Sequence, residues 1–177
     1  MVQTKVHDLV LKHLNKSDPN IIKNLVKSVE KSGAVCHLGV IISNSLMNSH
    51  TRNDSFLQDN LEWVSKANNW ARFTATASLG AIHMGNKANG LSIIAPYMPG
   101  GNGVPSIYTQ AGSYYGLGLI FANSNDETIL GLLVDALNAP TSTRDVMQHG
   151  IYLGIGLVAM GTHNASKLLI LITFRFI

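Results

Sequence analysis

The amino-acid sequence predicts an all-α fold, an α-solenoid of helix–turn–helix repeats of about 38 residues each. Two observations predict it: a segment rich in small residues recurs at that spacing, and amphipathic helical patterns lie between its copies. The composition is that of a folded chain, because 46% of the 177 residues are hydrophobic and only 13% are charged. Those values exclude intrinsic disorder and a coiled coil, which both need more charge.

The recurring segment is eleven residues long and aligns without gaps in three copies that begin at Thr74, Gly112 and Gly150. Small residues occupy its first, fifth and seventh positions: Thr74, Ser78 and Gly80, then Gly112, Gly116 and Gly118, then Gly150, Gly154 and Gly156. This spacing fits a strand as well as a helix, but residues 69–84 and 147–160 are too long for typical strands. Small residues four apart then share one helix face, so we predict that these nine residues let neighbouring helices pack closely.

The remaining elements complete the predicted units in chain order. Residues 1–31 are expected to form helices that lead into the solenoid, which covers residues 32–163 and starts with a looser copy of the repeat at residues 34–48. Amphipathic second helices are predicted at residues 54–67 and 125–137, the latter opening with capping residues and acids that suit a helix start. Proline- and glycine-rich stretches break the chain between units.

The C-terminal segment, residues 164–177, is an atypical apolar tail without a polar outer face. Solenoids need polar terminal repeats for solubility, so we expect the chain to be a truncated piece of a larger protein and to self-associate when isolated. No apolar run reaches the length of a transmembrane helix, so no membrane partner is expected. Membrane association through residues 168–177 remains the alternative reading of that tail.

Glycine-rich segments also raise the hypothesis of a small nucleotide-binding enzyme. Residues 80–87 resemble a phosphate-binding loop but lack the Lys-Ser/Thr ending, and residues 154–159 lack the third glycine of a dinucleotide fingerprint. Helix packing explains both better, because the same positions recur in every copy. We therefore expect no bound cofactor and keep nucleotide binding as the alternative from another functional class.

Catalytic and metal sites are not expected either. Cys36, the single cysteine, is predicted to be a buried structural thiol, and the adjacent His37 would point about 100° away from it on a helix. His83, His149 and His163 occupy different repeat positions, with no cysteine or carboxylate at ligand spacing. The lysines of the first 31 residues lack the arginine clusters and interleaved aromatic residues of a nucleic-acid surface, so none is expected.

Four residues are candidates for contact with a partner protein. Trp63 and Trp70 are expected to wedge between consecutive helices, and either one could instead be an interface hot spot. Arg72 and Arg144 stand near the starts of glycine-rich helices, where a positive charge is unfavourable beside the helix dipole. Each arginine could pair with a neighbouring repeat or with a partner.

Several segments together resemble a known family. Residues 59–63 and 69–80 (Asn-Trp-Ala-Arg-Phe-Thr-Ala-Thr-Ala-Ser-Leu-Gly), with residues 115–123 and 149–161, resemble the larger proteasome/cyclosome-repeat (PC-repeat) subunits of the 26S proteasome regulatory particle. The resemblance covers about residues 32–163, and its most specific part is residues 63–80. It implies a non-catalytic scaffold whose repeats close into a toroid, of which this chain would be an incomplete segment.

The same resemblance implies partners and a location. The partners would be other regulatory-particle subunits, namely the ATPase ring, the lid and the ubiquitin-handling subunits, and the location would be the cytoplasm and nucleus. The implied role is to support ubiquitin-dependent protein degradation and to regulate proteasome activity. A PC-repeat scaffold of the large cyclosome subunit remains the alternative within the same class, since the Gly-x-Gly repeats alone fit either one.

Overall fold

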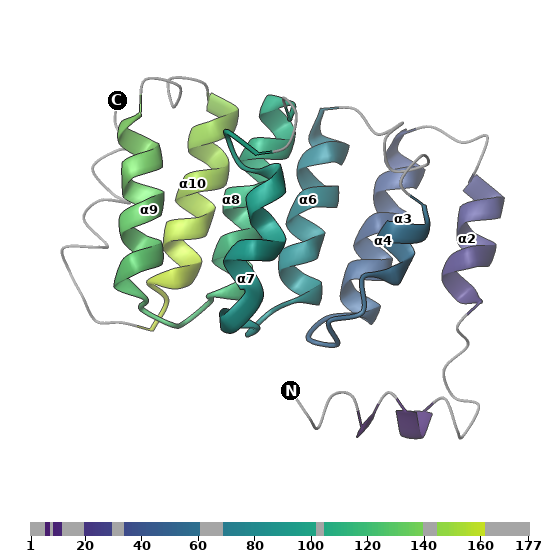
Figure 1. Ribbon diagram of the computed structural model, residues 1–177. Helices are drawn as coiled ribbons and strands as arrows, with labels where there is room; N and C mark the ends of the chain where they lie inside the picture. Colours follow the sequence, from purple (N-terminus) through teal and green to yellow (C-terminus); the bar gives the residue numbers. More distant parts are fainter. Residues whose placement is uncertain are drawn as a thin grey trace.

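The computed structural model describes residues 6–7, 9–11, 20–29, 34–60, 69–101, 105–139 and 145–161. Within these ranges all regular structure is helical, which confirms the predicted all-α fold (Figure 1). The elements are α2 (Ile21–Val29), α3 (Ala34–Met47), α4 (Ser55–Asp59), α6 (Trp70–Ile82), α7 (Lys87–Ile94), η1 (Ala95–Tyr97), α8 (Ile107–Ile120), α9 (Glu127–Asn138) and α10 (Asp145–Val158).

The helices form two rows. The inner row contains α3, α6, α8 and α10, in which each helix packs beside the next, and the contacts are most extensive between α6 and α8 and between α8 and α10 (Figure 1). The outer row contains the shorter helices α4, α7 and α9, which lie against the inner row, and α2 packs beside α3. This stacking of helix pairs is the predicted α-solenoid.

Local sequence signals place the starts of α8 and α9. Ser106 caps α8, since its hydroxyl accepts a hydrogen bond from the backbone N–H of Thr109 at 3.2 Å. Asp126 caps α9, where one carboxylate oxygen accepts from the N–H groups of Thr128 at 3.0 Å and Ile129 at 3.2 Å. These bonds satisfy amide groups that the first turn of a helix leaves without intrahelical partners.

We expect Asp126→Ala to lower the free energy of unfolding by about 1 kcal/mol, because α9 loses both side-chain capping bonds. Urea denaturation followed by circular dichroism would measure the change. Asp135→Ala is the matched control, since Asp135 lies exposed inside the same helix. An Asp126 variant no less stable than the Asp135 variant would contradict the assigned cap.

The turns after α6, α8 and α10 share one conformation. Gly85, Asn123 and Gly161, each 38 residues after the last, adopt left-handed φ angles of 76°, 56° and 76°. The backbone N–H of Gly85 donates to the carbonyl of Ile120, and that of Asn123 donates to Leu157, both at 2.9 Å. The turns at Gly85 and Asn123 therefore each satisfy a carbonyl at the C-terminal end of the next inner helix.

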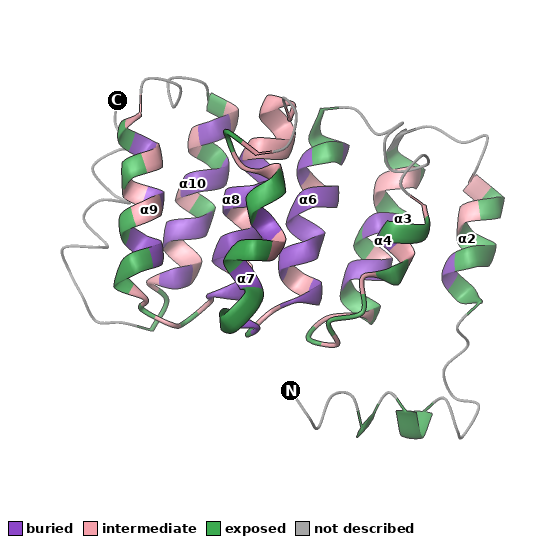
Figure 2. Ribbon diagram, viewed as in Figure 1, coloured by how far each residue is buried: buried purple, intermediate pink, exposed green. Residues whose placement is uncertain are grey.

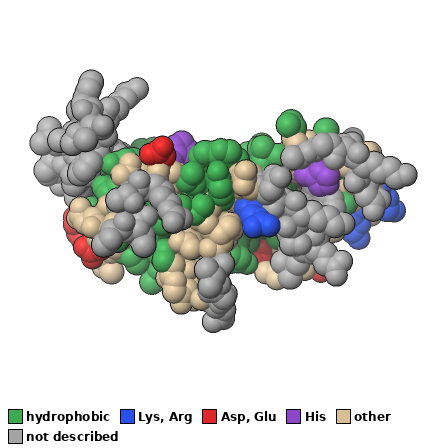
Figure 3. Space-filling view, turned by 90° about the horizontal axis from the view of Figure 1, so that it is seen from above, with side chains coloured by type: hydrophobic (Ala, Val, Ile, Leu, Met, Phe, Trp, Pro, Cys, Tyr) green, Lys and Arg blue, Asp and Glu red, His purple; other side chains and the backbone are tan. Residues whose placement is uncertain are grey.

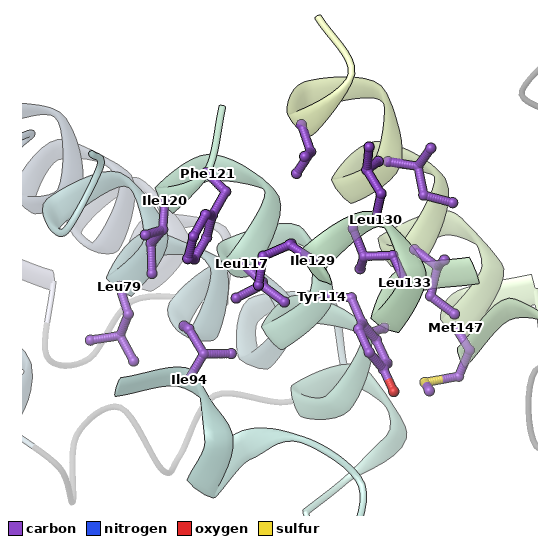
Figure 4. Close-up of a cluster of buried hydrophobic side chains, with 14 of the residues drawn as sticks. Leu79, Ile94, Tyr114, Leu117, Ile120, Phe121, Ile129, Leu130, Leu133 and Met147 are labelled. Carbon is purple, nitrogen blue, oxygen red and sulfur yellow. The ribbon is translucent and has the colours of Figure 1, made fainter. Parts of the chain in front are cut away.

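A single hydrophobic core runs between the two rows (Figures 2 and 4). Leu117 of α8 and Leu133 of α9 are fully buried in it, and Ile94 reaches it from α7. Of the predicted apolar positions of α9, Ile129, Leu133 and Leu137 are buried, whereas Leu132 is only half-buried. The second helix predicted at residues 54–67 is described only for its start, as α4, because residues 61–68 lie outside the described ranges.

Candidate functional site

The inner helices approach each other through backbone atoms at the glycine positions. On α8, a Cβ atom added to Gly112 would overlap the carbonyl group of Phe73 on α6. One added to Gly116 would lie 3.3 Å from the carbonyl oxygen of Thr76. From the other side, a Cβ on Gly80 of α6 would overlap the backbone of Gly116. Larger side chains at Gly80 and Gly112 would force α6 and α8 apart.

The contact between α8 and α10 repeats this arrangement 38 residues later. Gly150 faces the carbonyl of Ala111, and a Cβ on Gly154 would lie 2.7 Å from the carbonyl oxygen of Tyr114. A Cβ on Gly118 would lie 2.9 Å from the carbonyl oxygen of Gly154. The first and fifth positions of a copy thus face the preceding helix, whereas the seventh position faces the following helix.

The remaining three predicted packing residues are Thr74, Ser78 and Gly156, and two of them carry hydroxyl groups where the other copies have glycine. Thr74 and Ser78 turn their hydroxyl groups to their own helix, donating to the carbonyls of Trp70 at 3.0 Å and Ala75 at 2.6 Å. Ser78 is buried and Thr74 is half-buried. Gly156, the seventh position of the third copy, lies half-buried on α10.

An aromatic cluster lies near the N-terminal ends of the inner helices. The Trp70 ring makes edge contacts with Phe73, Tyr108 and His149, at centroid distances of 5.4, 5.4 and 5.5 Å. Phe73 also stacks on Tyr115 at 5.8 Å. The cluster spans α6, α8 and α10, yet the Trp70 side chain is 48% exposed. An exposed tryptophan held by three other rings suits a protein contact, because its orientation is already fixed.

Of the other three residues predicted to contact a partner, the structure describes only Arg72. Arg72 is exposed in the first turn of α6, two residues after Trp70. Trp63 and Arg144 lie outside the described residues. The structure therefore places two of the four candidate residues, Trp70 and Arg72, at the same end of α6. This end of α6 is the candidate contact site that the described residues define.

The buried His83 forms a contact with the half-buried Asp54 that the sequence did not suggest. His83 follows α6 and is 7% exposed, and its Nε2 atom lies 3.3 Å from a carboxylate oxygen of Asp54. Burial and then the charge of Asp54 raise the pKa of the Tyr97 phenol. The His83–Asp54 contact ties the end of α6 to the residue that precedes α4, across 29 residues of sequence.

Asn44 is a second buried polar residue. It is 1% exposed, and its Nδ2 atom has no hydrogen-bond partner, whereas its Oδ1 atom accepts from Nδ2 of Asn48 at 3.0 Å. At successive 38-residue steps along the chain, equally buried positions hold isoleucine or valine: Ile82, Ile120 and Val158. An unpaired amide in an apolar position costs free energy.

We expect Asn44→Leu to raise the free energy of unfolding by about 1 to 2 kcal/mol, because it removes the unpaired Nδ2 group while filling a similar volume. The Nδ2 atom of Asn48 keeps a bond to the carbonyl of residue 44 at 3.1 Å. Thermal unfolding would measure the gain, with Asn48→Leu, a change at a less buried position, as the comparison. If the Asn44 variant is instead less stable than the wild type, the Asn44 amide makes a hydrogen bond that stabilises the fold.

The predicted burial of Cys36 is wrong, because the thiol is exposed near the start of α3, before the helix reaches its buried turns. In the described parts of the chain, no three His, Cys, Asp or Glu side chains come together as a metal site. Across the same ranges, no helix has the length and hydrophobicity that a bilayer-spanning segment needs.

Comparison with known proteins gives a consistent picture. Residues 112–143 match the proteasome/cyclosome repeat. The chain is 47% identical over 152 residues to 26S proteasome non-ATPase regulatory subunit 1 homolog B of Arabidopsis thaliana, covering 84% of this chain and 15% of the relative. It is 41% identical over 153 residues to the 26S proteasome regulatory subunit RPN2 of Saccharomyces cerevisiae, covering 83% and 16%. The chain thus spans about a sixth of the length of these relatives.

Proposed function

We propose that the chain, which matches the proteasome/cyclosome repeat at residues 112–143, is a member of that repeat family and acts as a non-catalytic scaffold segment of the base of the 26S proteasome regulatory particle. The observation that carries this proposal is the sequence identity over more than four fifths of the chain to proteins named as regulatory subunits of that complex. The role would be to support ubiquitin-dependent degradation and to regulate the proteasome through protein contacts.

The architecture supports a scaffold. Successive inner helices meet through backbone atoms at Gly80, Gly112 and Gly118, which holds the repeats in fixed spacing. Repeats stacked in this way form extended surfaces along the row, where partners can bind to several units at once. The proposed partners are other regulatory-particle subunits in the ATPase ring, the lid and the ubiquitin-handling group. The proposed location is the cytoplasm and nucleus, with no nucleic acid or membrane bound.

Capture by purified regulatory particle tests this function. The tagged full chain is mixed with the particle, and bound subunits are identified by mass spectrometry. We expect the chain to retain regulatory-particle subunits, and Arg72→Glu to weaken that retention without loss of helix content, because Arg72 lies exposed beside Trp70. Lys87→Glu is the control, as another exposed charge reversal that lies on the outer row.

Two other results would overturn the proposal. Retention of cyclosome subunits in place of proteasome subunits would assign the chain to the other scaffold of the same repeat class. Saturable binding of labelled ATP or NAD at micromolar concentration, together with no retention by the particle, would favour a nucleotide-binding protein.

A further inference from the structure

The contact between α3 and α6 lacks the glycine packing that joins the later inner helices. The first and fifth repeat positions, which face the preceding helix on α8 and α10, hold Thr74 and Ser78 on α6. Gly39 is the one glycine of α3, and a Cβ atom added to it would meet no atom within 4 Å. Glycine contacts of the kind that join α8 to its neighbours therefore do not link α3 to α6, and the α3–α6 contact is the less extensive one.

The hydrophobic core also ends at this contact. Among the described residues, its buried members extend from Leu57 of α4 to Val158 of α10. Ile22 of α2 and both Val40 and Ile41 of α3 are buried as well, but they lie outside that cluster. Buried residues are accordingly sparse on α2 and α3 and dense on α6, α8 and α10 (Figure 2). The described chain thus contains a large block, α4 to α10, and a small unit formed by α2 and α3.

The turn at residues 48–52 joins the small unit to the block. The backbone N–H of His50 donates to the carbonyl of Ala81 at 3.2 Å. The N–H of Arg52 donates to the carbonyl of Ile82 at 3.1 Å. These bonds anchor the far end of the turn to the C-terminal end of α6. At the opposite end of α3, Val35 is 80% exposed, so the first turn of this helix is not held against the block.

This turn has an unfavourable backbone conformation. His50 and Arg52 both have φ angles of 62°, in the left-handed region. The turn after α8 has the same alternation, but there Asn123 and Asn125 have φ angles of 56° and 50°. Asparagine tolerates this region better than residues with longer side chains, because its short polar side chain can hydrogen-bond locally. Other conformations of residues 48–52 are therefore closer in free energy to the observed one than those of the later turn.

We propose that residues 48–52 are a hinge about which α2 and α3 rotate as one unit against the block of α4 to α10. Hinges are residues at the ends of elements that absorb changes in φ and ψ while the packed bodies on either side stay intact. In the view along the helices the molecule is elongated along the row (Figure 3), so rotation at this turn carries α2 through the widest arc. A scaffold with this hinge presents its first unit at an adjustable angle to its rigid repeats, whichever complex it serves.

Distances between pairs of spin labels on the full chain test the hinge. Cys36, the single cysteine, is exposed in the first turn of α3 and takes one label, and Arg72→Cys on α6 takes the other. The reference pair is Arg72→Cys with Asp145→Cys, in the first turn of α10, in a chain with Cys36→Ser. We expect the first distance distribution to be at least about twofold broader than the reference, because the reference pair lies within the block. Circular dichroism verifies that each labelled chain is folded, and the exposed Lys87→Cys on α7 replaces Arg72→Cys in every pair if that variant does not fold.

A label at the other end of α3 separates rotation from local unfolding. Leu46 is 71% exposed beside the turn, so Leu46→Cys is paired with Arg72→Cys in the chain with Cys36→Ser. A rigid rotation moves this label less than it moves Cys36, and its distribution should stay within about 1.5-fold of the reference width. Equal broadening at both ends of α3 would indicate that the helix unfolds, which would overturn the hinge.

Substitutions in the turn test whether its conformation controls the motion. The double variant His50→Asn and Arg52→Asn gives the turn the Asn-Xaa-Asn pattern of residues 123–125. It should narrow the distribution between Cys36 and Arg72→Cys to the reference width and leave the reference pair unchanged. Two results contradict the hinge: equal widths of the two pairs in the chain with the natural turn, or a broad first distribution that the two substitutions leave unchanged.

Discussion

Gly80→Ala is expected to lower the free energy of unfolding by about 2 kcal/mol, although alanine is the better helix former. The added Cβ would overlap backbone atoms of Gly116, including its carbonyl carbon at 2.7 Å. Backbone atoms cannot rotate away as a side chain can, so α6 and α8 must separate along their most extensive contact. Overpacking of this kind costs about 1 to 3 kcal/mol or more, which outweighs the helix propensity that alanine gains, about 1 kcal/mol.

The matched control for Gly80→Ala is Gly131→Ala. Gly131 lies exposed in the interior of α9, and a Cβ there would meet no atom within 4 Å. This variant should therefore gain about 0.5 to 1 kcal/mol from helix propensity alone. Gly118→Ala, which occupies the same repeat position as Gly80 and faces Gly154, should match the loss. If all three substitutions shift the urea midpoint in the same direction, close backbone packing does not control the spacing of the helices.

Leu133→Ala is expected to cost about 3 kcal/mol, which is the other large effect. Leu133 of α9 is fully buried, and its Cδ2 atom lies 3.4 Å from the Cβ position of Gly154 on α10. Truncation leaves a cavity between the outer and inner rows, and because glycine has no side chain, Gly154 cannot fill it. Buried leucine-to-alanine changes cost about 2 to 5 kcal/mol.

Urea unfolding monitored by circular dichroism measures the Leu133 variant against Leu91→Ala. Leu91 has the same side chain on the outer row, but it is 41% exposed. Its truncation should therefore cost about 0.5 kcal/mol at most. Equal losses at the two positions would mean that α9 does not depend on this contact for its place in the fold.

Local spacing was sufficient to predict the helical repeats, because the 38-residue period and the small residues four apart both lie in continuous stretches of sequence. The cap of α9 was predictable for the same reason, since Asp126 stands directly before its helix. The predicted apolar face of α9 likewise follows helical spacing. These features depend on residues within one or two turns of each other.

Features that depend on distant residues could not be predicted. Asp54 meets His83 only because the turn after α3 reaches the end of α6. The 38-residue period relates Asn44 to Ile82, but only the structure shows that Asn44 is buried and that its Nδ2 atom has no hydrogen-bond partner. The exposure of Cys36 was missed because a lone apolar thiol is usually buried.

The hydrogen bonds from Gly85 and Asn123 to the following inner helices should determine which parts of the chain unfold locally first. Each unit is tied mainly to its immediate neighbours, so fluctuations that expose amide groups should begin at the ends of the row and move inward. The helix α8 receives such a bond at Ile120 and is flanked by glycine contacts on both sides. Its amides should therefore exchange with deuterated solvent most slowly, while those of α2 exchange first.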